Sequence, residues 1–256
     1  MDIHFDCTQC GRCCHNLKLP MSVEEAIRWA GKGHQVQLLI EAAPAFEEPA
    51  ETSPERFRYE RSFPAVSGTI PIRVNAILVA AFEGACPHLR PDMRCGNYEE
   101  RPRVCRIYPA EISPNITLSP SSKMCPTEAW SEDLPILLEN GAIVDPALAM
   151  LIDAHRVATL ADVSIKAYAC HVLDIATTAF ANEGYAVQSP EPARLVEVLT
   201  AALRANPEFS EPTQWSFLTN RRATLNMLDQ VEADAIKTEN GARYIGFFDD
   251  QIFDAI

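Results

Sequence analysis

The sequence predicts an α+β protein: a small, irregular, cysteine-rich metal-binding half with a short antiparallel sheet, followed by a mainly helical half. Two observations lead to this prediction. Eight of the nine cysteines lie between residues 7 and 125, among many Pro, Gly and Arg residues, whereas helix signals dominate after residue 131. With 256 residues, 47% of them hydrophobic, the chain can bury a sizeable core. We therefore expect a cysteine-cluster metal-binding domain over residues 1–130 and a mainly helical, acidic domain over residues 131–256.

The region before residue 83 shows one helix signal and one strand signal. Ser22 can cap a short helix that runs to about Ala30, with a glutamate placed to complete a capping box. Residues 43–54 combine prolines with glutamates, a composition typical of an exposed loop. Residues 57–82 are rich in aromatic and β-branched side chains, with a turn expected at Ser67-Gly68. We expect a small antiparallel sheet or hairpin here.

Four helices are predicted in the second half. The first begins at Asp145-Pro146, because an N-cap residue followed by proline is a typical helix start. The others are expected over residues 162–183, about 191–205 and 219–238, where apolar residues recur with helical spacing. The tail at residues 243–248 is expected to form a strand or an extended arm packed on this half.

Charge and the N-terminal residues limit the classes of function. The net charge is −13, and residues 131–256 carry 8 Lys/Arg against 19 Asp/Glu. Nucleic-acid binding needs clustered positive charge, so we expect no nucleic-acid partner. No apolar run approaches the roughly 20 residues of a membrane span, and residues 1–6 lack the features of a secretory signal. We expect a cytoplasmic protein without membrane contact, where clustered cysteines more often bind metal than form disulfides.

The opening run Cys7-Thr8-Gln9-Cys10-Gly11-Arg12-Cys13-Cys14 is the strongest chemical signal in the chain. Thiolates are soft ligands suited to zinc and to iron–sulfur clusters, and C-x-x-C spacing lets two sulfurs reach one metal. Neighbouring side chains tend to point apart, so Cys13 and Cys14 either serve two metals or include one non-ligand. The eight cysteines then form two sites of four, or one site of four with spares. The candidate metal ligands are Cys7, Cys10, Cys13, Cys14, Cys86, Cys95, Cys105 and Cys125. Cys170, at an apolar helical position, is interpreted as a buried hydrophobic residue.

Arginines are interleaved with the later cysteines. Four thiolates around a divalent ion leave a net negative site, which guanidinium groups can offset while donating hydrogen bonds to sulfur. Arg101 and Arg106 flank Pro102 and Cys105, so we predict that these two arginines support the bound cofactor. The other arginines are interpreted as solvated loop charges.

These residues resemble a known bacterial cysteine-cluster family, described as a zinc- or iron-chelating domain (YkgJ-like). The residues that carry the resemblance are Cys7, Cys10, Gly11, Cys13, Cys14, Cys86, Pro87, Leu89, Cys95, Tyr98, Arg101, Pro102, Cys105, Arg106, Tyr108 and Pro109. The similar region spans roughly residues 5–126. A distantly similar protein is the flagellin lysine N-methylase, which is associated with an iron–sulfur cluster. The resemblance implies bound zinc or iron, and it favours an iron–sulfur cluster such as 4Fe-4S over zinc.

Three functions remain open from the sequence. The first is a metal-binding protein that uses the eight cysteines to hold an iron–sulfur cluster or zinc. The second is an enzyme with the metal at its active site, either a redox enzyme or a protein-modifying enzyme of the lysine N-methylase kind. The third is an interaction module that zinc stabilises and whose acidic half recruits a protein. The expected partner in the last two cases is a protein partner or protein substrate.

Overall fold

The computed structural model describes residues 2–208, 211–237 and 243–247. Two compact units make up the chain: unit 1 contains residues 1–22 and 80–159, and unit 2 contains residues 23–79 and 160–256. Compactness does not test which segments fold independently, so the domain boundary at residue 130 stays a prediction. Among the described residues, no helix combines the length and apolar character that a membrane span requires.

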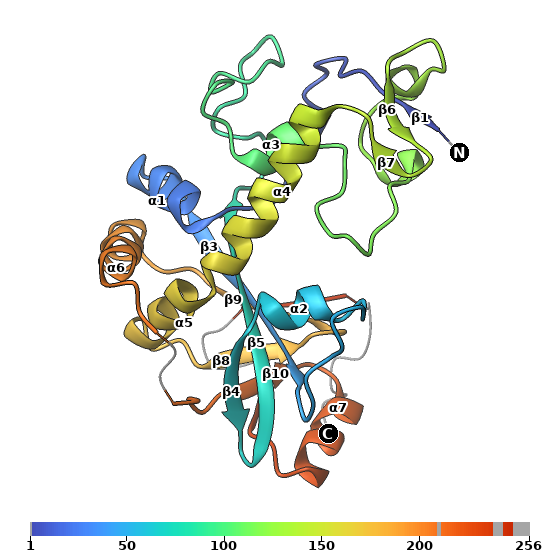
Figure 1. Ribbon diagram of the computed structural model, residues 1–256. Coiled ribbons are helices and arrows are strands. Elements are labelled where there is room, and N and C mark those ends of the chain that lie inside the picture. The colour runs from blue at the N-terminus through green and yellow to red at the C-terminus, as the bar shows by residue number, and fades with distance from the viewer. Residues whose placement is uncertain (1, 209–210, 238–242, 248–256) are drawn as a thin grey trace. The chain divides into compact units, whose positions relative to one another are not determined.

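Unit 2 is built around a large mixed sheet (Figure 1). The strands that unit 2 contributes to it are β3 (Val36–Pro44), β4 (Phe63–Ser67), β5 (Ile70–Ala81, which ends in unit 1), β8 (Thr177–Phe180), β9 (Gly184–Gln188), β10 (Ser216–Thr219), β11 (Ala235–Lys237) and β12 (Arg243–Gly246). Strands β11, β10, β8 and β3 lie in that order and run parallel. Strand β9 is antiparallel to β3 and to β12, and β4 forms a hairpin with β5. The carboxyl ends of the four parallel strands therefore meet at one edge of the sheet.

The helices of unit 2 are α1 (Val23–Gly31), α2 (Arg56–Glu60), α5 (Val163–Val172), α6 (Pro192–Ala205) and α7 (Arg222–Gln230). Helix α6 packs against both α1 and α5. Its side chains Leu195 and Leu199 are fully buried, as are Leu38 of β3 and Phe217 of β10. Burying one such side chain stabilises the fold by about 1.5–3 kcal/mol relative to leaving it exposed. Unit 2 thus has a hydrophobic core of its own.

Unit 1 contains less regular structure. Its elements are β1 (Ile3–His4), η1 (Arg12–Cys14), β2 (Lys18–Pro20), α3 (Arg103–Ile107), η2 (Pro120–Ser122), η3 (Thr127–Trp130), β6 (Ile136–Glu139), β7 (Ala142–Ile143) and α4 (Pro146–Ala161, which ends in unit 2). Strands β1, β6 and β7 form a small antiparallel sheet. A core cluster of Ile107, Ala110 and Ile152 joins α3 to α4. Between Glu83 and Pro102 the chain runs in turns and loops.

The expectation of a mainly helical second half is wrong. The segment predicted as a helix over residues 162–183 is helical only to Val172, and then forms strand β8 and the start of the β8–β9 turn. The segment predicted over residues 219–238 contains a shorter helix, α7, that lies between strands β10 and β11; residue 238 is outside the described residues. Both errors share a cause. Short apolar strands buried on both faces show no alternation, so periodicity does not distinguish them from helix.

Other element predictions are confirmed. The helices expected from Asp145-Pro146 and over residues 191–205 are α4 and α6, and the turn at Ser67-Gly68 joins β4 to β5. That hairpin belongs to the large sheet, however, and not to a small separate one. Helix α2 (Arg56–Glu60) contains residues 57–60, which belonged to the predicted strand region. The tail residues 243–246 form strand β12, as one of the two alternatives predicted, while residue 248 lies outside the described part.

Candidate metal centre

The opening cysteine motif is shaped by Gly11. This residue has a φ of +68°, and a Cβ on it would lie 2.8 Å from Cε of Met93 and 3.0 Å from the Met93 carbonyl oxygen. A side chain at position 11 would therefore be strained and would meet Met93. The turn η1 follows at once, closed by the Cys14 amide, which donates to the Gly11 carbonyl at 3.0 Å. This tight turn spans Gly11 to Cys14, and it links Cys10 to the adjacent pair Cys13 and Cys14.

Backbone pairing brings the second cysteine segment to the first. The Cys86 amide donates to the Cys14 carbonyl at 2.7 Å, and His15 pairs antiparallel with Ala85 in an isolated bridge. The Asn16 side chain closes this contact by accepting from the Gly84 amide at 2.6 Å. Cys14 and Cys86, which are 72 positions apart in the sequence, thus lie on adjacent backbone segments.

The loop that follows Cys86 brings Cys95 back beside residues 88–90. The Gly96 amide donates to the His88 carbonyl at 2.6 Å, and the Arg90 amide donates to the Arg94 carbonyl at 2.9 Å. Leu89 and Cys95 form a further antiparallel bridge. Helix α3, seven residues beyond Gly96, then supplies Cys105.

The N-terminal strand brings Cys7 toward Cys125. Strand β1 pairs with β6, and the Asp6 amide donates to the Ala129 carbonyl at 3.1 Å. The aromatic rings of Phe5 and Trp130 pack with their centroids 4.8 Å apart. Cys7 directly follows Asp6, and Cys125 lies four residues before Ala129. The backbone contact between Asp6 and Ala129 therefore brings the two cysteine-bearing segments together.

Each of the eight predicted cysteines is in electrostatic range of at least one other, and these interactions define two groups. Cys14 interacts with Cys86, Cys95 and Cys105. Cys125 interacts instead with Cys7, Cys10 and Cys13. The hydrogen bond between Cys13 and Cys14 joins the groups, and Cys13 also interacts with Cys105. Cys170 belongs to unit 2, where it is buried on α5.

The thiol side chains are free, and none of the nine is in a disulfide. Cys7 is exposed and the other seven of the candidate ligands are partly buried. Among the described residues, no three His, Cys, Asp or Glu side chains stand in a geometry that could already hold a metal ion. The donor chemistry nevertheless fits a soft metal, because eight thiols converge in a cysteine-rich loop region.

A hydrogen bond between two thiols and the burial of others shift the pKa values of this group. The Cys13 thiol donates a hydrogen bond to Cys14, which raises the pKa of Cys13 and lowers the pKa of Cys14. Burial raises the pKa of Cys105 to about 12, and burial also raises the pKa of Cys86 and of Cys125. Most of these sulfurs therefore hold their protons at neutral pH unless a cation replaces them.

The two predicted support arginines occupy different environments. The Arg101 guanidinium stacks 3.9 Å from the centroid of the Tyr98 ring, and its charge acts to lower the pKa of Cys13 and of Cys105. The Arg101 Nε is buried without a hydrogen-bond partner. Arg106 is exposed in the last turn of α3. The structure thus brings Arg101 to the thiols, while the roles of Arg101 and Arg106 stay predictions.

Tyr108 is a residue of the centre to which sequence reasoning assigned no role. Its hydroxyl accepts from the Met124 amide at 2.9 Å and also hydrogen-bonds the Cys125 side chain. Burial raises the pKa of Tyr108, so the phenol stays protonated and acts as the donor to Cys125. No local spacing predicts this role, because Tyr108 lies just beyond the end of α3 and its partner Cys125 belongs to a separate segment.

Comparisons with known proteins bear on this region alone. Residues 6–126 match the family model CxxCxxCC, described as "Putative zinc- or iron-chelating domain". No curated protein and no solved structure matches the chain. The matched range contains the eight converging cysteines, Arg101, Arg106 and Tyr108, and it ends before α4 begins. Residues 6–126 are therefore similar to a zinc- or iron-chelating domain built on a cysteine motif.

Proposed function

We propose that unit 1 is a metal-binding module in which eight cysteines supply the ligands. The observation that carries this proposal is the convergence of thiols from four separate segments: residues 7–14, 86–95, α3 and Cys125. A loop region with little regular structure needs another source of order. Metal coordination can provide it, since binding free energies on the order of 10 kcal/mol are found for structural zinc sites.

The ligands divide into two sets of four. One set is Cys14, Cys86, Cys95 and Cys105, and the other is Cys7, Cys10, Cys13 and Cys125. The electrostatic partners of Cys14 and Cys125 support this division. Neighbouring side chains tend to point apart, so Cys13 and Cys14 are poorly placed to bind one metal. The division accounts for this pair, because each of the two cysteines then belongs to a different set.

The metal proposed is iron in an iron–sulfur cluster, with zinc as the alternative. The family match supports zinc or iron without distinguishing them. The distant resemblance of the cysteine motif to that of the flagellin lysine N-methylase favours the iron–sulfur form. An iron–sulfur cluster would supply electron transfer, whereas zinc held by four thiolates would supply stability to the fold. Arg101 would offset part of the negative charge of the thiolates.

The test is the metal content of single variants, one from each set. Cys10→Ser and Cys105→Ser are purified beside the wild type, and iron, zinc and acid-labile sulfide are measured per chain. Serine keeps the side-chain volume but is a poor ligand for soft metals. Each variant should lose about half of the bound metal if the two sets are separate, and the double variant should lose nearly all of it.

Cys170→Ser is the matched control, because Cys170 is buried in unit 2 and belongs to neither set. It should retain the full metal content of the wild type. Loss of all metal in each single variant would indicate one shared metal site instead of two separate ones. Unchanged metal content in Cys10→Ser and in Cys105→Ser would contradict the proposed ligands.

A further inference from the structure

A group of charged side chains lies near the carboxyl ends of the parallel strands in unit 2, and none of its members belongs to the candidate metal centre. Glu41, near the end of β3, is 3% exposed, although carboxylates are seldom buried without partners. It pairs in register with Ala179 of the neighbouring parallel strand β8. In open sheets with parallel strands, ligands bind outside the carboxyl ends of the strands. This edge of the sheet is therefore a candidate for a ligand-binding site in unit 2.

Two arginines converge on this one carboxylate. Arg58 donates from Nη2 to Glu41 Oε2 at 3.3 Å and to the Ala181 carbonyl at 3.1 Å. Arg61 forms a longer ion pair, with its Nη2 3.7 Å from Glu41 Oε1. Asn75 also donates to Oε1, at 3.0 Å. Two positive charges thus share one buried negative charge.

Arg61 is incompletely satisfied by these contacts. Among the described residues, its Nε is buried without a hydrogen-bond partner, and its ion pair with Glu41 is too long for a hydrogen bond. Burial also acts against the charge of Arg61 and lowers its pKa. A buried charged donor without an acceptor is costly, so its presence requires an explanation. The other N–H donors of the Arg61 guanidinium belong to a side chain that is 28% exposed, so a ligand can supply an acceptor to them.

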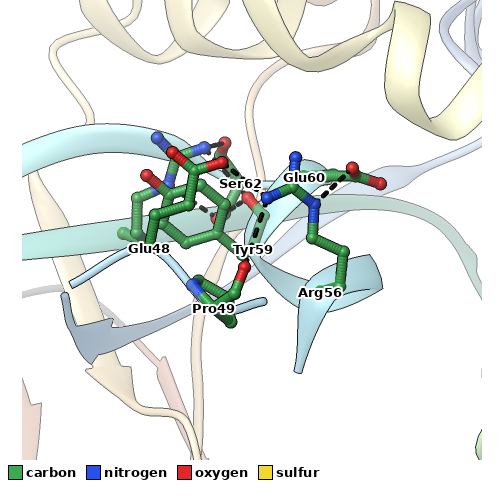
Figure 2. Close-up of polar contacts among 7 residues, drawn as sticks. Glu48, Pro49, Arg56, Tyr59, Glu60 and Ser62 are labelled. Atoms are coloured by element: carbon green, nitrogen blue, oxygen red, sulfur yellow. Dashed lines mark hydrogen bonds and ion pairs between the residues drawn. The ribbon is translucent and has the colours of Figure 1, made fainter. Parts of the chain in front are cut away.

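The helix that carries Arg58 is held firmly in place. Arg56 donates to Glu60 at 2.7 Å and to Glu48 at 2.5 Å; these residues are drawn in Figure 2. From the β4–β5 hairpin, Arg73 donates to the Tyr59 carbonyl at 2.9 Å and stacks with its guanidinium carbon 4.2 Å from the Tyr59 ring centroid. Helix α2 is thus anchored on both sides, and the two arginines do not depend on a ligand for their position.

The surroundings of the two guanidinium groups remain accessible and partly aromatic. The side chains of Arg58 and Arg61 are 38% and 28% exposed. The Phe57 ring lies 5.5 Å from the Arg61 guanidinium carbon, and the Tyr185 phenol is in electrostatic range of Glu41 and both arginines. An organic anion could therefore contact aromatic surface while its oxygens meet the guanidinium donors.

We propose that Arg58, Arg61 and Tyr185 form a binding site for a small organic oxyanion at the carboxyl ends of β3 and β8. The ligand is a carboxylate or a phosphate monoester, because two parallel N–H donors of a guanidinium match two oxygens of either group. The chain as a whole is strongly negative, so an anion is attracted only where positive charge is locally in excess. This site is independent of the metal proposal, since all its residues lie in unit 2.

The test is isothermal titration calorimetry on the full chain at constant ionic strength, with chloride as the background anion. Three probes are used: inorganic phosphate, phenyl phosphate and benzoate. The wild type should bind phenyl phosphate or benzoate, and the preferred probe identifies the ligand as a phosphate ester or a carboxylate. Arg61→Gln should weaken that binding about 10- to 100-fold, the effect expected for losing hydrogen bonds to a charged group.

Two further variants make the result specific. Arg61→Lys keeps the charge but removes the fork of donors, so it should weaken binding less than Arg61→Gln and more than the control. Arg194→Gln is the control for net charge, because Arg194 lies exposed on α6 in a surface pair with Glu197. It should bind like the wild type. Absence of binding by the wild type to all three probes at 20 mM, or equal binding by Arg61→Gln and the wild type, would overturn the proposal.

Discussion

At the residue scale, single polar side chains determine how the cysteines are presented. Tyr108 connects α3 to the segment that bears Cys125, since its hydroxyl meets both the Met124 amide and the Cys125 side chain. Hydrogen-bond donors to ligating groups orient those groups and tune the metal they hold. Tyr108 is therefore a positioning residue of the proposed centre, and it acts through Cys125.

Replacing Tyr108 by Phe should weaken metal binding by about 10- to 100-fold, the usual effect of removing such a hydrogen-bonding partner. The ring and its packing are kept, so the loss would be due to the hydroxyl. Metal transfer to a competing chelator measures it. Tyr98→Phe is the control, because Tyr98 is 54% exposed and offers its ring to Arg101. Equal metal transfer from Tyr108→Phe and the wild type would remove Tyr108 from the centre.

A second residue-scale feature is the buried Lys166 on α5. It is 6% exposed, and burial lowers its pKa from 10.5 to about 8 in spite of the nearby Asp162. Between these two values the unfolded chain binds more protons than the folded chain, so stability must rise with pH in this range. Below pH 8 both states are charged at this position and the contribution of Lys166 no longer changes.

Relative to Lys166→Met, the wild type should gain on the order of 3 kcal/mol in free energy of unfolding between pH 8 and pH 10.5. Urea unfolding at several pH values measures the gain. The exposed Lys32 provides a control variant, Lys32→Met, whose stability should follow the wild-type curve. A constant difference between the wild type and Lys166→Met from pH 7 to pH 10 would show that Lys166 keeps its charge when buried.

At the element scale, α6 joins local signals to core packing. Glu191 caps its N-terminus by accepting from the Ala193 and Arg194 amides, Pro192 occupies the first turn, and Asn206 ends the helix in the left-handed region. Leu195 and Leu199 then lie on the buried face that α1 and α5 cover. The helix is thus specified by its own sequence and stabilised by tertiary contacts.

Leu195→Ala should lower the free energy of unfolding by about 2–5 kcal/mol, because it removes a fully buried side chain and leaves a cavity. Leu203→Ala, on the same helix, is the matched control, since Leu203 is 37% exposed and its loss should cost far less. Chemical unfolding of both variants gives the comparison. Similar losses for the two variants would mean that α6 is not packed as described.

At the scale of the whole molecule, the two units should differ in their dependence on metal. Unit 2 has a sheet with a hydrophobic core, while the loop region of unit 1 carries the cysteines that we propose as metal ligands. Removing metal with a chelator should speed amide hydrogen exchange across residues 84–106 by at least about tenfold. Strands β3, β8 and β10 should keep their protection. Equal exchange rates in residues 84–106 with and without the chelator would contradict a structural role for the metal.

Features that depend on local residue spacing could be predicted from the sequence. Features that depend on contacts between distant segments could not. The Cys7–Cys14 run and the helix after Glu191-Pro192 are recognisable within a few residues, and both could be predicted. Strand β8 was missed because Thr177–Phe180 is buried by pairing with β3 and β10, which lie far away in the chain. The Glu41 and Arg61 pairing and the contact of Tyr108 with Cys125 depend on the assembled fold, so no spacing rule finds them.

The measurement that tests the central claim most directly is an ultraviolet–visible spectrum with elemental analysis on protein purified without oxygen. The proposal predicts a brown protein that contains iron and acid-labile sulfide, with a broad absorption near roughly 400 nm that dithionite bleaches. A colourless protein with about two zinc ions per chain would keep the eight-cysteine centre and replace the cluster by zinc. Protein that is fully folded, and holds neither iron nor zinc, would contradict the account.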